Sequence, residues 1–205
     1  MIGEFRLIEK LKSLIPRPLQ GLIPIGDDTA VLAAPRGKFF LFTTDVIVEG
    51  VDFLVGRRPF GPKGPEGRRG ARPEQIGRKA LAVNLSDIAA MGGKPLAFVV
   101  AWGIPKKYPE RWVLGVARGM LRLARQFRVS WVGGDISRSN QFFISVALLG
   151  ETRQGRIIRR SGARAGDAIY VTGTLGGSIE GRHLTFTPRL SEGQFLRGRF
   201  RPSAM

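Results

Sequence analysis

The stretch PEQIGRKALAVNLSDIAAMGG (73–93) decides the fold class. Pro73 suits the first turn of a helix, and the pair Gly92–Gly93 suits its end. Between them, apolar side chains recur at the spacing of a helix that packs on a sheet: Ile76, Ala80, Val83, Ile88 and Met91. The next stretch, PLAFVVAWGI (95–104), predicts a buried strand because it contains no charged residue.

The flanking sequence predicts more elements of both kinds. Helical spacing predicts a helix over 4–14, ended by Pro16, and a longer amphipathic helix over 108–127. Aromatic and β-branched residues predict further strands over 38–50, 129–137, 142–151 and 167–178, the last running into a glycine turn. The fold class is therefore α+β, a mixed sheet flanked by helices, with a boundary near 151–166.

Composition limits the classes of protein. The chain has 205 residues, 43% of them hydrophobic, which is enough for a packed core. It has no cysteine, so disulfides, thiolate metal sites and cysteine nucleophiles are excluded. The first residues do not form a signal peptide and no stretch approaches a membrane span, so we expect a soluble cytoplasmic protein.

The chain is strongly basic, with 33 Lys and Arg against 16 Asp and Glu and a net charge of +17. This charge favours either an anionic partner, such as a nucleotide or nucleic acid, or simply a solvated basic surface. Six of the basic residues lie in 56–73 beside nine Gly or Pro, which predicts a flexible cationic loop. That loop either contacts phosphates or is solvated.

Six of the seven aspartates lie in four short motifs: GDD (26–28), TTDVIVEGVD (43–52), NLSD (84–87) and GGD (133–135). Small or apolar residues border each motif, and an acid in such surroundings is costly to bury unless it is paired or binds a cation. Carboxylate and hydroxyl oxygens suit Mg²⁺, which proteins hold with a few carboxylates and substrate phosphates. Taken singly, each motif is equally an ordinary turn, strand or helix segment.

The chain lacks the residues that several other catalytic mechanisms require. The chain has no Walker-type loop and no protein-kinase glycine loop, and GTLGGS (173–178) fits a simple turn as well as a phosphate contact. His183 is the only histidine, so a catalytic pair of histidines is excluded. We do not expect His183 to act as a general base.

Taken together, the motifs resemble the thiamine-monophosphate kinase family of the aminoimidazole-ribonucleotide-synthetase-like superfamily. The resemblance rests on IGDDTAVL (25–32), TTDVIVEGVDF (43–53), IGRKALAVNLSDIAAMGGKP (76–95), GGDISRS (133–139) and RRSGARAGDAIYVTGTLGGS (159–178). It implies an N-terminal ATP- and Mg²⁺-binding and dimerisation domain over 1–150 and a stub of a second domain over 151–205. It also implies homodimers that pair through their sheets.

The resemblance also implies an activity and a site. The family transfers the γ-phosphoryl group of ATP to thiamine phosphate, giving thiamine diphosphate, and Mg²⁺ aligns and neutralises the phosphates. The implied Mg²⁺ ligands are Asp28, Thr43, Thr44, Asp45, Asp87 and Asp135. The implied ATP contacts are Gly134, Asp135 and Arg160, and the implied thiamine phosphate contact is Asp52.

The sequence departs from the family pattern in three places. Asp52 stands where the family usually has histidine, the helical stretch between GGS and HL is nearly absent, and the later acidic signature of the second domain is missing. Two alternatives therefore stay open: a non-catalytic dimerisation or nucleotide-binding module, and a basic nucleic-acid-binding protein. A third keeps the fold but changes the phosphate acceptor.

Overall fold

The computed structural model describes residues 3–16, 22–23, 25–55, 70–153, 155, 157–178, 180–200 and 202–205. Most of the predicted cationic loop at 56–73 lies outside these residues. Six strands form one sheet in the order β1-β2-β3-β6-β4-β5, in which β4 and β5 are parallel and all other neighbours are antiparallel. The strands are β1 (Leu22–Ile23), β2 (Ala30–Ala34), β3 (Lys38–Val48), β4 (Lys94–Ile104), β5 (Ser130–Arg138) and β6 (Phe143–Arg153).

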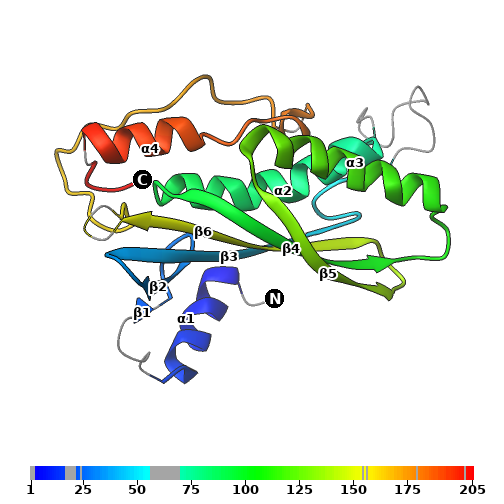
Figure 1. Ribbon diagram of the computed structural model, residues 1–205, viewed down its shortest axis with the longest axis horizontal. Coiled ribbons are helices and arrows are strands. Elements are labelled where there is room, and N and C mark those ends of the chain that lie inside the picture. The colour runs from blue at the N-terminus through cyan, green and yellow to red at the C-terminus, as the bar shows by residue number, and fades with distance from the viewer. Residues whose placement is uncertain are drawn as a thin grey trace.

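Helices cover the sheet unequally. On one face lie α2 (Pro73–Ala90), α3 (Glu110–Phe127) and α4 (Leu190–Arg199), while α1 (Glu4–Leu14) lies on the other side, beneath β3 (Figure 1). We call the face that carries α2, α3 and α4 the helix face, and the opposite face of the sheet the open face. The predicted mixed sheet with flanking helices is confirmed.

The core lies between α2 and the helix face. Residues Ile76, Ala80, Ile88 and Met91, predicted to face the sheet, are each at most 2% exposed. Side chains alternate along a strand, so every second residue of β6 packs against the same layer; Ile144, Val146 and Leu148 are completely buried there. The stretch 73–93 therefore forms the helix that its spacing predicts.

Two glycines let α2 and α3 approach each other closely. A methyl group on Gly77 would lie 1.9 Å from the carbonyl oxygen of Val116, and one on Gly119 would lie 1.9 Å from that of Glu74. Any larger residue would force the helix backbones apart, because packed interiors leave no room for an added carbon. This close packing fixes α2, the helix that carries the predicted site residue Asp87.

The C-terminal segment differs from its prediction. Residues 167–171 form no strand, and Ile169 and Tyr170 are 93% and 90% exposed. Their β-branched and aromatic composition favours a strand, but no strand of the described residues pairs with them, and an isolated strand is not stable. The sequence pattern also missed α4, which packs on α2 and donates a hydrogen bond from Gln194 to the Gly93 carbonyl at 2.9 Å.

The division into 1–150 and 151–205 stays a prediction. Among the described residues, no helix has the length and apolar character needed to cross a bilayer.

Candidate functional site

The candidate site forms where β3 leaves the cover of β2. β2 pairs with β3 only as far as Phe42, so the next residues of β3 lie on a free edge beside α2. Thr43 and Asp45 point to the helix face, and the Thr43 hydroxyl donates to the Asp87 carboxylate at 2.5 Å. The Asp45 amide donates to the buried Asn84 side chain at 3.1 Å. Asn84 and Asp87 are three residues apart and therefore share one face of α2.

Three carboxylates influence one another at this edge. Burial raises the pKa of Asp87 to about 7; the Thr43 hydroxyl opposes this shift, and the negative charges of Asp45 and Asp28 add to it. Burial also raises the pKa of Asp45, with a further contribution from Asp52. We call Asp28, Thr43, Asp45 and Asp87 the acidic cluster. A cation bound there would relieve the repulsion and the loss of solvation together.

The GDD motif is held by two arginines from far along the chain. Asp27 accepts from the Arg159 side chain at 2.9 Å and from the Arg160 backbone amide at 2.8 Å, and only 4% of its side chain is exposed. Arg160 pairs with Asp28 through its guanidinium group. No base borders the GDD motif in the sequence, but folding brings basic residues that are distant in sequence to Asp27 and Asp28.

Asp52 closes the turn after β3. Its carboxylate accepts from the Val48 amide at 2.8 Å, and its carbonyl accepts from the Lys79 ammonium at 2.5 Å. Lys79 also lies 3.0 Å from Nδ1 of His183. Burial lowers the pKa of Lys79, while the charge of Asp52 opposes that change. Because Asp52 also raises the pKa of Asp45, this turn lies within electrostatic range of the acidic cluster.

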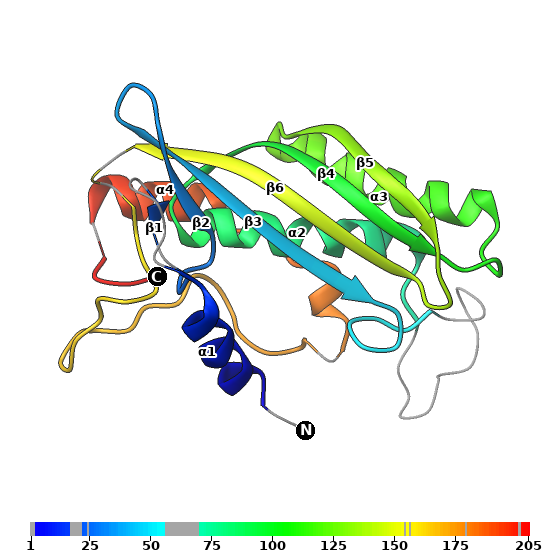
Figure 2. The same cartoon turned by 90° about the horizontal axis from the view of Figure 1, so that it is seen from below.

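The other predicted site residues, Thr44, Gly134 and Asp135, lie on the sheet away from the acidic cluster. Thr44 points to the open face, 3.5 Å from the Ser145 hydroxyl. Register places Asp45, Val146, Val100 and Gly134 in one row across the sheet. Asp45 and Gly134 are therefore separated by three strand spacings, about 14 Å. Asp135 pairs with Ala101 on the open face of the edge strand β5, visible in Figure 2 at the far side of the sheet from β2.

The donor set of the acidic cluster fits Mg²⁺ in its chemistry. It offers carboxylate and hydroxyl oxygens, and the buried hydroxyl of Thr29, next to Asp28 in the chain, has no hydrogen-bond partner among the described residues. Within the described residues, however, no group of three or more acidic or histidine side chains is arranged so that it could hold a metal ion. The predicted ligands Thr44 and Asp135 are not brought to the cluster within one chain. Sequence reasoning missed Lys79 and Asn84, and it gave Asp27 no role of its own within the GDD motif.

Comparison with known proteins defines the class of this protein. Residues 26–152 match the family "AIR synthase related protein, N-terminal domain", and the chain belongs to this family. The match includes β2 to β6, α2 and α3, and therefore the acidic cluster.

The particular relatives are thiamine-monophosphate kinases, as the motifs predicted. Those of Bacillus subtilis and Aquifex aeolicus are 35% and 40% identical over 187 residues, which is 89% of this chain and 53% of each relative. A solved structure of AaThiL complexed with AMPPCP and TMP matches with a TM-score of 0.79 and 33% identity, covering 95% of this chain and 62% of that one. The chain spans about half the length of the curated relatives it matches.

Proposed function

We propose that this chain carries the ATP- and Mg²⁺-binding part of a thiamine-monophosphate kinase, an enzyme that transfers the γ-phosphoryl group of ATP to thiamine phosphate. The observation that carries the proposal is the acidic cluster, because a carboxylate with a pKa near 7 beside two others is suited to a bound cation. The names of the relatives supply the reaction. The same proposal places the enzyme in the cytoplasm.

The residues of the chain have separate tasks in this proposal. Asp28, Asp45 and Asp87, with the hydroxyl of Thr43, would hold Mg²⁺, which when bound neutralises and aligns the phosphates. Arg160 lies beside Asp28 and is placed to move between that carboxylate and a phosphate oxygen, since guanidinium groups bind both. Asp52 would sit next to the acceptor, held by its turn and by Lys79.

We further propose a homodimer through the open face. Phe42, Val46, Val99 and Val132 are 40% to 64% exposed, and exposed apolar residues gathered on one sheet face are typical of an interface. A second copy on that face would also lie against Thr44 and Asp135, the two predicted ligands that point to the open face.

Phosphorus NMR tests the kinase directly. The purified chain is mixed with ATP, Mg²⁺ and thiamine phosphate, and we expect ADP and thiamine diphosphate to appear. Asp45→Asn should abolish the product, while Glu110→Gln, which removes an exposed acid at the start of α3, should keep it. Failure of both variants and of the parent chain, with Mg²⁺-dependent binding of AMPPCP retained, would instead support a nucleotide-binding module.

That alternative has a specific observation in its favour. The chain spans 53% of the curated relatives, so part of their length has no counterpart here. The basic nucleic-acid alternative rests on the net charge of +17. It predicts binding to duplex DNA that weakens steeply with salt and is unchanged in Asp45→Asn.

A further inference from the structure

A hollow at the far end of the sheet is separate from the acidic cluster. A cavity of about 440 Å³ and an adjoining one of about 420 Å³ share Pro105, Lys106 and Arg138 in their walls. Ile104, which ends β4 at this hollow, is four residues beyond Val100, and Val100 is already two strands from Asp45. Together these offsets separate the hollow from Asp45 by more than about 15 Å.

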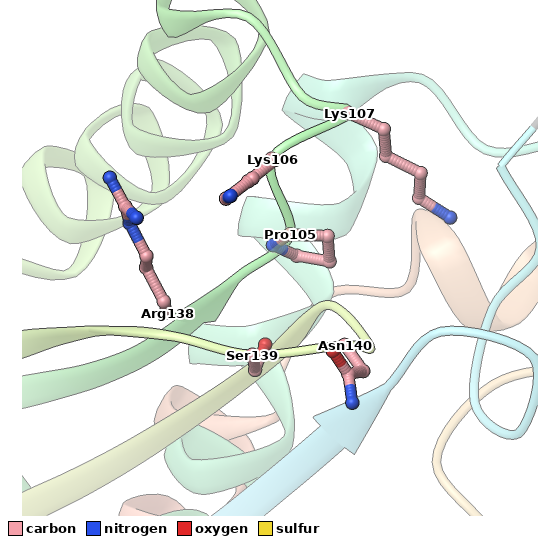
Figure 3. Close-up of a pocket in the computed structure, with 6 residues that line it drawn as sticks. All are labelled: Pro105, Lys106, Lys107, Arg138, Ser139 and Asn140. Atoms are coloured by element: carbon pink, nitrogen blue, oxygen red, sulfur yellow. The ribbon is translucent and has the colours of Figure 1, made fainter.

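The described residues that line this hollow carry only positive charge. They include Lys106, Lys107 and Arg138, and none of them is acidic. Lys107 is already paired with Glu49 at 2.9 Å and lies over the ring of Tyr108. Lys106 and Arg138 form no ion pair with any described residue. Figure 3 shows their side chains extending into the same space, whereas Lys107 points away from it.

Two unpaired cations that share a hollow repel each other, and an anion between them removes that cost. The position of the hollow in the sheet also favours the binding of an anion. β4 and β5 are parallel, and the carboxyl ends of parallel strands are where such sheets bind ligands. The loop after β4 then leads directly into α3, whose first turn carries the positive end of the helix dipole.

The backbone around the hollow is held in place before any ligand binds. The Ser139 hydroxyl donates to the Gln141 carbonyl at 2.5 Å, which fixes the turn after β5. Beneath the loop, the rings of Tyr108 and Trp112 stack with centroids 4.0 Å apart, and both contact the fully buried Phe142. Binding there would order little more than the two cationic side chains, which keeps its entropic cost low.

We propose that this hollow binds the phosphate group of a small phosphorylated ligand, with Lys106 and Arg138 as its charged contacts. A bidentate guanidinium and a point-like ammonium together suit a tetrahedral anion with two negative charges. The site is independent of the proposed kinase reaction. A small ligand is favoured over nucleic acid because the two unpaired cations lie at one hollow rather than along a stripe.

Calorimetric titration with inorganic pyrophosphate tests the site. The full chain is used at constant salt with EDTA, so that no Mg²⁺ carries phosphate to the acidic cluster. We expect one site per chain, weakened about tenfold by Lys106→Gln and about tenfold by Arg138→Gln, the loss typical of one charge-assisted hydrogen bond. Arg125→Gln removes the same charge at the opposite end of α3 and should leave the affinity unchanged.

The outcomes are distinct. Asp45→Asn should bind pyrophosphate as the parent chain does, so failure of the kinase proposal would not alter this result. Binding of both pyrophosphate and ADP would identify a diphosphate group as the ligand, and binding of pyrophosphate alone an inorganic anion. Equal weakening by Arg125→Gln, no weakening by either pocket variant, or binding only to duplex DNA would overturn the proposal. Circular dichroism melts check that each variant folds, as expected for exposed positions.

Discussion

Asp87 should make the protein less stable as the pH rises toward 7. The ordinary pKa of its carboxyl is 3.8, and burial raises it to about 7 in the folded chain. Between these values the folded state keeps a proton that the unfolded state has lost, so the free energy of unfolding falls as pH increases. The whole gap corresponds to about 4 kcal/mol. Because the carboxyl is partly solvated, we expect about half, ~2 kcal/mol.

Asp87→Asn removes this titration while keeping an oxygen that can accept from Thr43. In urea denaturation with EDTA, the variant should match the parent chain near pH 4 and exceed its free energy of unfolding by ~2 kcal/mol at pH 8. Added Mg²⁺ should stabilise the parent chain at pH 8 and have little effect on the variant. Glu110→Gln, at an exposed carboxylate at the start of α3, is the control for removal of an acid. A parent and a variant with parallel pH profiles would refute the assignment of the raised pKa to Asp87.

Two more predictions concern packing and assembly. Gly119→Ala should lower the free energy of unfolding by more than about 2 kcal/mol, whereas Gly198→Ala, where an added methyl meets nothing within 4 Å, should not; urea denaturation compares them. Val46→Glu should convert a dimer to a monomer in light scattering, because it places a charge on the open face.

Local sequence predicted the central helix well because its spacing, its start and its end all agree. The same reasoning failed at 167–171, where composition favours a strand but pairing depends on a neighbour that no local pattern reveals. It also failed for α4, whose buried residues are few and whose packing on α2 depends on small residues such as Gly193.

The sequence predicted only part of the candidate site, because distances across the sheet also depend on contacts that no local pattern reveals. Motifs indicate which acids are unusual, and Thr43, Asp45 and Asp87 do lie together. Distance across the sheet, however, is set by strand order, and the order β3-β6-β4-β5 separates Asp135 from them. The arginine partners of the GDD motif come from more than a hundred residues away and carry no signal near that motif.

The Asn84 side chain has a consequence for solubility. An edge strand exposes amides that can recruit a strand from another molecule, and proteins commonly block such edges. On β3 beyond Phe42, Asn84 takes up the Asp45 amide with its side-chain oxygen, while its own amide group donates to the Ala80 carbonyl at 3.1 Å. A helix side chain thus occupies the place of a neighbouring strand, and the edge that carries the acids is poorly suited to start a cross-β aggregate.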